Sequence, residues 1–137
     1  MKNKHIFFLL AIIVFTSCTK ENNIPSTGPS ALAGKWNWVS SSGGFAGQTY
    51  TPKTEKKTIR IEYDTNFVYR YYVNDTLKSE TRYQLVKGRS IYSQDSTLII
   101  VNKLSSIRQS YAIQHNDTLI LRDECYDCFE HLYTRIK

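Results

Sequence analysis

The fold is decided by residues 57–86, which read KTIRIEYDTNFVYRYYVNDTLKSETRYQLV. Isoleucine, valine, tyrosine and threonine, which favour strands, recur at alternate positions, and no apolar stripe of helical period and length runs through the segment. Two short polar breaks divide it into three predicted strands: 57–63, 66–73 and 76–86. The alternation therefore predicts an antiparallel meander with one aromatic face turned inward.

The faces of these strands also predict their register. A two-residue turn at 74–75 would set Tyr71 opposite Lys78, so that aromatic and charged faces would coincide. A three-residue turn at 74–76 keeps the faces matched, because like side chains then meet across the strands. We therefore predict an odd-length turn. The predicted pairs are Val73–Leu77, Phe67–Tyr83 and Arg70–Glu80 in this hairpin, and Ile59–Tyr71, Ile61–Tyr69 and Tyr63–Phe67 in the hairpin before it.

The same alternation extends outward from this segment in both directions. The further predicted strands are 35–40, 89–101, 107–114, 118–123 and 129–136, with a break near Asp95 as an alternative for 89–101. A chain of about eight strands with mostly short connections predicts an all-β fold, a small antiparallel up-and-down barrel. Such a barrel leaves an interior just wide enough for side chains or for one small ligand.

The first 17 residues are typical of a lipoprotein signal peptide. Lys2 and Lys4 precede an apolar run over 6–15, which suits a signal core and is too short to span a bilayer. Thr16-Ser17-Cys18 resembles the lipobox of bacterial lipoproteins, so we expect cleavage before Cys18 and lipid (palmitate) on that cysteine. The alternative is an ordinary secretory signal. The predicted organisation is a signal peptide at 1–17, a flexible tether at 18–33 and a barrel domain at 34–137.

Charge and the start of the mature chain indicate where the protein works. The formal net charge of +6 falls to about +4 once Lys2 and Lys4 are removed. Basic residues are scattered, with no run longer than Lys56-Lys57, which argues against a nucleic-acid partner. The stretch 18–21, Cys-Thr-Lys-Glu, resembles the surface-export signal of Bacteroidetes lipoproteins. We expect an outer-membrane lipoprotein of the cell envelope. The export signal favours the outer face, and the inner leaflet is the alternative.

Two stretches resemble the lipocalin-like lipoproteins of Bacteroidetes. Gly34-Lys35-Trp36 matches the Gly-X-Trp motif of lipocalins. The matching residues beyond it are Trp36, Val39, Ser40, Ser41, Ser42, Gly43, Gly44, Phe45, Gly47, Thr51, Pro52, the run 117–123 and Tyr133-Thr134-Arg135. This resemblance covers nearly all of 34–137 and implies a lipocalin-like β-barrel in which Arg135 stacks on Trp36. It implies little about activity.

The cysteines predict a crosslink in the last loop. Acylation of Cys18 leaves Cys125 and Cys128 as the remaining pair, and thiols exposed outside the cytoplasm tend to oxidise. The predicted disulfide competes with a zinc site that adds His131 and Asp123 or Asp127, and with a redox Cys-X-X-Cys motif. We expect neither metal nor cofactor. The acidic side chains around this turn, expected to be solvated, are Asp123, Glu124, Asp127 and Glu130.

The inward aromatic face favours ligand binding over catalysis. The expected ligand-binding residues are Phe45, Phe67, Tyr69, Tyr71 and Tyr83. The loop Ser40–Gly47 is expected either as a lid over the barrel mouth or as a flexible connection. We expect a small, partly apolar ligand. No nucleophile signature such as Gly-X-Ser-X-Gly is present, and no nucleophile, base and stabiliser can be named together, so we do not expect an enzyme. The alternative is a filled barrel that binds an envelope protein through Tyr72 and the acidic turn at 123–130.

Overall fold

The structure is a computed structural model that describes residues 29–93, 96–103 and 105–137. Its elements are α1 (Pro29–Leu32), β1 (Gly34–Gly43), β2 (Gln48–Tyr50), α2 (Pro52–Glu55), β3 (Ile59–Tyr63), β4 (Val68–Val73), β5 (Thr76–Arg89), β6 (Ser96–Asn102), β7 (Gln109–Gln114), β8 (Thr118–Asp123) and β9 (Phe129–Arg135). The predicted signal peptide, the lipid-bearing Cys18 and most of the tether lie outside the described residues.

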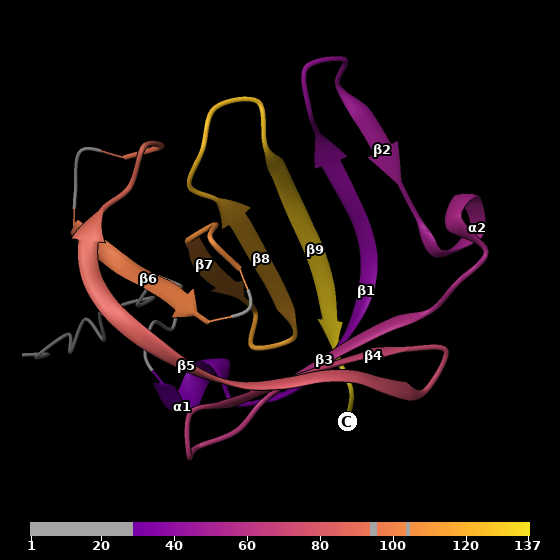
Figure 1. The fold of residues 1–137 in the computed structure, drawn as a ribbon, viewed down its shortest axis with the longest axis horizontal. Coiled ribbons are helices and arrows are strands. Elements are labelled where there is room, and N and C mark those ends of the chain that lie inside the picture. Colours follow the sequence, from indigo (N-terminus) through magenta and orange to yellow (C-terminus); the bar gives the residue numbers. More distant parts are fainter. Residues whose placement is uncertain (1–28, 94–95, 104) are drawn as a thin grey trace, which may run out of the picture.

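The predicted small all-β barrel is confirmed. The strands pair in the order β2-β1-β3-β4-β5-β6-β7-β8-β9, and every pairing is antiparallel. A further pairing of β1 with β9 closes eight strands into a barrel and leaves β2 as an extra strand on the edge of β1 (Figure 1). Closure is possible because β1 is long: its first half pairs with β3, its second half with β2, and both halves with β9.

The predicted strand over 89–101 begins later than expected. β5 continues to Arg89, and β6 begins only at Ser96. Between them, the Glu124 carboxylate accepts hydrogen bonds from the Ser90 hydroxyl and from the Ile91 N–H, both at 2.8 Å. This contact joins positions more than thirty residues apart, so local alternation could not reveal it.

The predicted lid over Ser40–Gly47 is instead mostly a hairpin. β1 continues to Gly43 and pairs with β2, so only residues 44–47 form a turn. The segment after β2 folds into α2, which begins with a capping box: Thr51 and Thr54 each accept a hydrogen bond from the other's backbone N–H. Residues 48–55, predicted as part of a connection, are therefore held in regular structure beside β1.

The β4–β5 hairpin has the predicted register in its body but not at its turn. Arg70 lies opposite Glu80, as predicted, and its Nε is 2.6 Å from the Glu80 carboxylate. Val73, however, pairs with Thr76 and not with Leu77. The turn therefore contains two residues, and the predicted three-residue turn is wrong.

A β-bulge reconciles the short turn with the register. The pairing shifts between Tyr71 and Tyr72, where Lys78 of β5 has no partner across the ladder. The turn residues 74–75 both have positive φ, as a two-residue hairpin turn requires. The extra residue, Lys78, turns the side chains on its N-terminal side in β5 to the opposite face of the sheet. Leu77 therefore points outward and is 47% exposed, contrary to its predicted inward position.

The β3–β4 hairpin is shifted by two residues from its predicted register. Ile61 lies opposite Tyr71, whereas the predicted partner was Tyr69. The cause is the turn, in which the Asp64 carboxylate accepts the N–H groups of Asn66 and Val68, each at 2.9 Å, and so delays the start of β4. A shift of two preserves the facing of side chains, so the predicted inner face survives.

One end of the barrel is closed by Trp36, and the predicted stack with Arg135 is present. Trp36 and Leu32 are fully buried, and the indole N–H donates to the Leu32 carbonyl at 3.0 Å. The Arg135 guanidinium carbon lies 3.9 Å from the ring centroid. The guanidinium N–H groups donate to the Ala31 and Ala33 carbonyls at 2.7 and 2.8 Å. The domain therefore includes α1, so the predicted boundary between the tether and the domain, after residue 33, lies too far along the chain.

Candidate functional site

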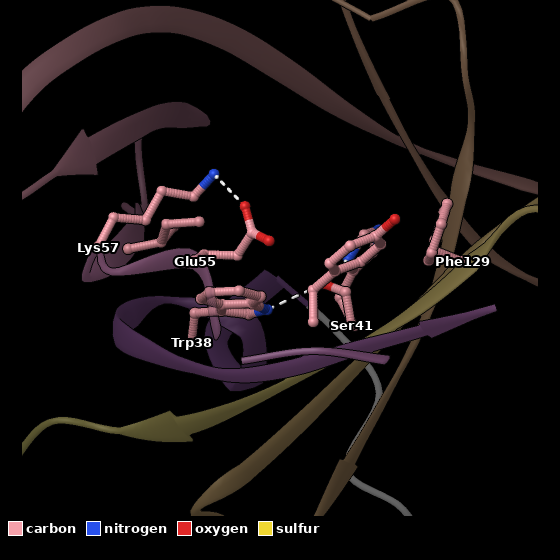
Figure 2. Close-up of a pocket in the computed structure, with 8 residues that line it drawn as sticks. Trp38, Ser41, Glu55, Lys57 and Phe129 are labelled. Carbon is pink, nitrogen blue, oxygen red and sulfur yellow. Dashed lines mark hydrogen bonds and ion pairs between the residues drawn. The ribbon is translucent and has the colours of Figure 1, made fainter. Parts of the chain in front are cut away.

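The candidate site is a pocket of about 240 Å³ beside the second half of β1 (Figure 2). We call it the mouth pocket. Its lining residues are Trp38, Ser41, Tyr50, Glu55, Lys57, Ile59, Phe129 and His131. They come from β1, β2, α2, the connection from α2 to β3, the start of β3 and the start of β9, so the extra strand and the short helix form one of its walls. Aromatic and aliphatic groups form most of the surface, and a few polar groups lie among them.

A β-bulge in β1 places the polar floor of the mouth pocket. Side chains in a strand alternate between faces, so Trp38 and Ser41, three positions apart, would ordinarily point to opposite sides. The pairing of β1 with β9 shifts between Trp38 and Ser40, and this extra residue turns both side chains inward. Ser41 then lies directly opposite His131 of β9.

A chain of hydrogen bonds runs across this floor. The Trp38 Nε1–H donates to Ser41 Oγ at 2.9 Å, and Ser41 Oγ lies 2.7 Å from His131 Nδ1. On the other side of the imidazole, His131 Nε2 lies 3.4 Å from a carboxylate oxygen of Asp123. Ser41 and Asp123 are both buried. The fold thus aligns a hydroxyl, an imidazole and a carboxylate contributed by three different strands.

The Asp123 carboxylate is held in its ionised form. Burial opposes ionisation, but hydrogen bonds from His131, from the Gln109 amide at 2.8 Å and from the Phe129 N–H at 3.4 Å outweigh it. The net effect is that the pKa of Asp123 lies below its ordinary value. A buried carboxylate with these partners holds the His131 ring in one orientation.

Asp123→Asn is expected to lower the free energy of unfolding by about 2 kcal/mol at neutral pH, because the amide loses the charge-assisted hydrogen bonds. Because the pKa of Asp123 is lower in the folded state, its ionised carboxylate stabilises the fold at every pH above the ordinary carboxyl pKa of 3.8. This stabilisation is lost as the pH falls through the lower native pKa. The difference between wild type and variant should therefore shrink below about pH 4. Urea unfolding at several pH values measures it, with the exposed Asp117→Asn as control. A difference that stays constant down to about pH 2 would contradict this account.

The aromatic residues expected to bind ligand do not line the mouth pocket. Phe45 lies at the tip of the β1–β2 hairpin and is 95% exposed. Tyr83 is buried with its ring centroid 5.4 Å from that of Phe67, and both line a separate depression of about 430 Å³. Tyr69 and Tyr71 pack against the core, as filling residues do. The structure brings four of the five near the same interior and leaves Phe45 outside it.

The pocket residues were missed because their positions depend on distant pairing. The sequence predicts His131 as an alternative zinc ligand, Asp123 as an alternative zinc ligand or a solvated acidic side chain, and Ser41 as part of a loop and of the matching string, but it does not predict them as one site. Tyr50 and Phe129 lie at strand ends, and their ring centroids are 5.8 Å apart across the pocket. The available sequence signal was the alternation of β9, which predicts His131 and Tyr133 on one inward face.

The predicted disulfide is present in the β8–β9 loop. Cys125 and Cys128 are bonded, with their Cα atoms 5.6 Å apart, so they are not thiolate ligands for zinc. Among the residues that the structure describes, no cluster of His, Cys, Asp and Glu is arranged to hold a metal ion. The expected solvated acidic turn is wrong for Asp123, which is buried, and for Glu124, which binds the 90–91 turn.

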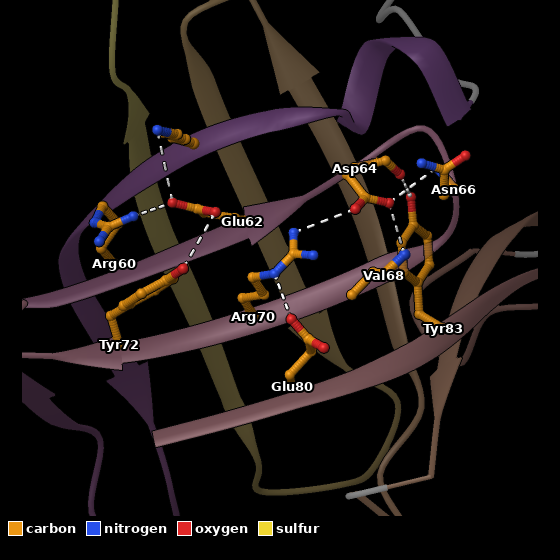
Figure 3. A network of polar contacts seen from close by, with 10 residues as sticks. Arg60, Glu62, Asp64, Asn66, Val68, Arg70, Tyr72, Glu80 and Tyr83 are labelled. Carbon is orange, nitrogen blue, oxygen red and sulfur yellow. Dashed lines mark hydrogen bonds and ion pairs between the residues drawn. The ribbon is translucent and has the colours of Figure 1, made fainter. Parts of the chain in front are cut away.

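Tyr72, the expected recognition residue on the outer face, is partly covered by its neighbours (Figure 3). The Arg60 guanidinium carbon lies 3.8 Å from the centroid of the Tyr72 ring, and the Tyr72 hydroxyl donates to Glu62 at 3.5 Å. Arg60 also pairs with Glu62, and Arg70 bridges Asp64 and Glu80. These contacts hold the ring within a polar network on β3, β4 and β5.

Comparison with known proteins adds no assignment to this geometry. In the stretches that the structure describes, no helix has the length and apolar character needed to cross a membrane. The resemblance to lipocalin-like lipoproteins stays a prediction, whereas the barrel itself stands on its strand pairings. No family model, no curated protein and no solved structure matches the chain.

Proposed function

We propose that this protein is a membrane-anchored lipoprotein of the cell envelope whose lipocalin-like barrel binds a small, largely apolar ligand in the mouth pocket. The observation that carries the proposal is the aromatic-walled pocket of about 240 Å³. Ligand sites are typically concave and mostly apolar, with a few placed polar groups, and pockets for drug-sized ligands have volumes of about 300–1,000 Å³. The mouth pocket is smaller, so its ligand has few heavy atoms.

The pocket lining favours an apolar ligand with at most one polar group near the rim. Ser41 and His131 already satisfy one another and their neighbours, so the floor offers a ligand no unsatisfied donor among the contacts described. At the rim, Lys57 Nζ lies 3.2 Å from the Glu55 carboxylate, and both side chains are about one-third exposed. An exposed ion pair of this kind contributes little to stability. A ligand carboxylate can therefore replace Glu55 as the partner of Lys57 at little cost to the fold.

The anchor rests on the sequence, because Cys18 lies outside the described residues. A charged start, the apolar run 6–15 and a small-residue pair before Cys18 support lipidation there. We expect cells fed radiolabelled palmitate to incorporate the label into the wild type and not into Cys18→Ser. A Cys18→Ser variant that takes up as much label would contradict the anchor.

Ile59→Phe is expected to weaken ligand binding at least about tenfold, because a larger side chain occupies space that the ligand needs. Ile59 lines the mouth pocket and is half-buried. Native mass spectrometry of the purified protein, after incubation with envelope lipid extracts, measures the bound species. Ile107→Phe is the matched control, because Ile107 is 41% exposed and does not line the pocket. No bound species with wild type, or equal binding by both variants, would contradict the proposal.

A further inference from the structure

The hydrogen-bond chain on the floor of the mouth pocket has a defined direction. The Trp38 indole N–H can only donate, and it donates to Ser41 Oγ at 2.9 Å. At the other end the ionised Asp123 can only accept, so His131 Nε2, 3.4 Å away, carries a proton. In the neutral imidazole Nδ1 is then the acceptor, and the Ser41 O–H donates to it across 2.7 Å.

This arrangement meets the geometric requirements of an activated serine. A nucleophile needs a base within about 2.6–3.2 Å, and the base needs a third group that fixes its orientation. Ser41, His131 and Asp123 take these three positions. The pairing of β1 with β9 holds Ser41 opposite His131, and the β8–β9 ladder, which ends beside Asp123, holds the carboxylate. The chain also ends in a cavity, because Ser41 and His131 both line the mouth pocket.

We propose that Ser41 accepts an acyl group from an activated carboxylic ester that enters the mouth pocket. Ser41 Oγ attacks the carbonyl carbon and forms a new C–O bond, while the bond from that carbon to the leaving oxygen breaks. His131 Nδ1 takes the Ser41 hydroxyl proton and delivers it to the leaving oxygen, which departs as an alcohol or phenol. No electron is gained or lost overall, and no further reactant is needed. Asp123 is a positioning residue, since it acts through His131.

The surroundings of Ser41 favour capture of the acyl group over rapid turnover. Negative charge develops on the carbonyl oxygen during the attack, and enzymes commonly stabilise it with two or more preorganised donors. The Trp38 indole N–H donates to Ser41 Oγ, which is the attacking oxygen, so in this arrangement it is not a donor to the carbonyl oxygen. The nearby Lys57 ammonium is paired with Glu55. Since neither group is directed at the carbonyl oxygen, the reaction is slow, and the acyl-serine should accumulate to one equivalent.

The test is acylation of the full-length protein with p-nitrophenyl acetate, which is small and has a good leaving group. We expect a burst of one equivalent of p-nitrophenolate and one acetyl group, located on Ser41 by peptide mass spectrometry. Ser42, exposed on the same strand and bonded to Thr49, is an internal control that should stay unlabelled. Ser42→Ala should label as the wild type does.

His131→Gln should label Ser41 at least about 100-fold more slowly, because general-base assistance contributes about 10²–10⁴. Binding of 4-nitroacetanilide, an unreactive amide of similar shape, reports whether the variant pocket is intact, through the fluorescence of Trp38 in the pocket wall. Equal labelling of Ser41 in wild type and His131→Gln would overturn the inference, and so would acetyl groups on lysines alone. Amide binding without a Ser41 adduct would overturn it while leaving the proposed ligand-binding function in place.

Discussion

Replacing Trp36 with alanine is expected to lower the free energy of unfolding by about 3–5 kcal/mol, which is a large share of the stability of a domain this size. The Trp36 side chain is fully buried beside Leu32, so its removal leaves a cavity at the closed end of the barrel. The change also removes the hydrogen bond to the Leu32 carbonyl and the ring beneath the Arg135 guanidinium. Each of these losses adds to the cost of the cavity.

Trp36→Phe separates packing from the polar contact. Phenylalanine fills part of the space but cannot donate to Leu32, so we expect a loss of about 1–3 kcal/mol. Urea unfolding followed by far-ultraviolet circular dichroism measures both variants, because the midpoint falls in proportion to stability when the slope is unchanged. A loss below about 1 kcal/mol for Trp36→Ala would show that this end of the barrel is not packed as described.

Gly43→Ala is expected to cost about 3–5 kcal/mol through two separate causes. Gly43 has φ +147°, a conformation that side-chain-bearing residues rarely adopt. A Cβ there would also overlap the Cys128 carbonyl oxygen and lie 2.9 Å from the Phe129 Cα. Relief of this overlap requires β1 to move away from β9, and that movement would disturb the contact between Ser41 and His131.

Gly47→Ala is the matched control for this prediction. Gly47 also has a positive φ, +62°, but no atom lies within 4 Å of a Cβ built on it. It should therefore cost only about 1 kcal/mol, from backbone strain alone. The same urea-unfolding experiment compares the stability of the two variants. Equal losses at Gly43 and Gly47 would mean that the close approach to β9 is absent.

Local patterns in the sequence were sufficient for most of the strands. Alternation of apolar residues over 57–86 and 107–136 sets which residues face inward, because the side-chain period of a strand is two wherever the strand is regular. Prediction failed where a distant or irregular feature intervenes. The segment that follows β5 is bound at Ser90 and Ile91 by the distant Glu124, and the inward position predicted for Leu77 was reversed by a bulge at Lys78.

The candidate site was much less accessible to prediction. Trp36 and Arg135 could be paired only through a resemblance, because they come from the first and last strands of the barrel and are far apart in the sequence. Ser41 could not be predicted as a site residue from the sequence. The bulge near Ser40 turns its side chain inward, and His131, the base, lies 90 residues away in the sequence. The expectation that no nucleophile, base and stabiliser can be named together reflects, for the nucleophile and the base, that separation along the chain.

The sequence alone determined that this is an all-β chain with one inward aromatic face, because strand propensity and alternation are local properties of the residues. It also carried the cysteine pair at 125 and 128, three positions apart. Only the tertiary structure decided that β1 closes on β9, that β2 and α2 wall a pocket, and that Ser41, His131 and Asp123 align. The physical reason is that closure and bulges are set by pairing between distant strands, and a shift of one residue turns a side chain to the opposite face.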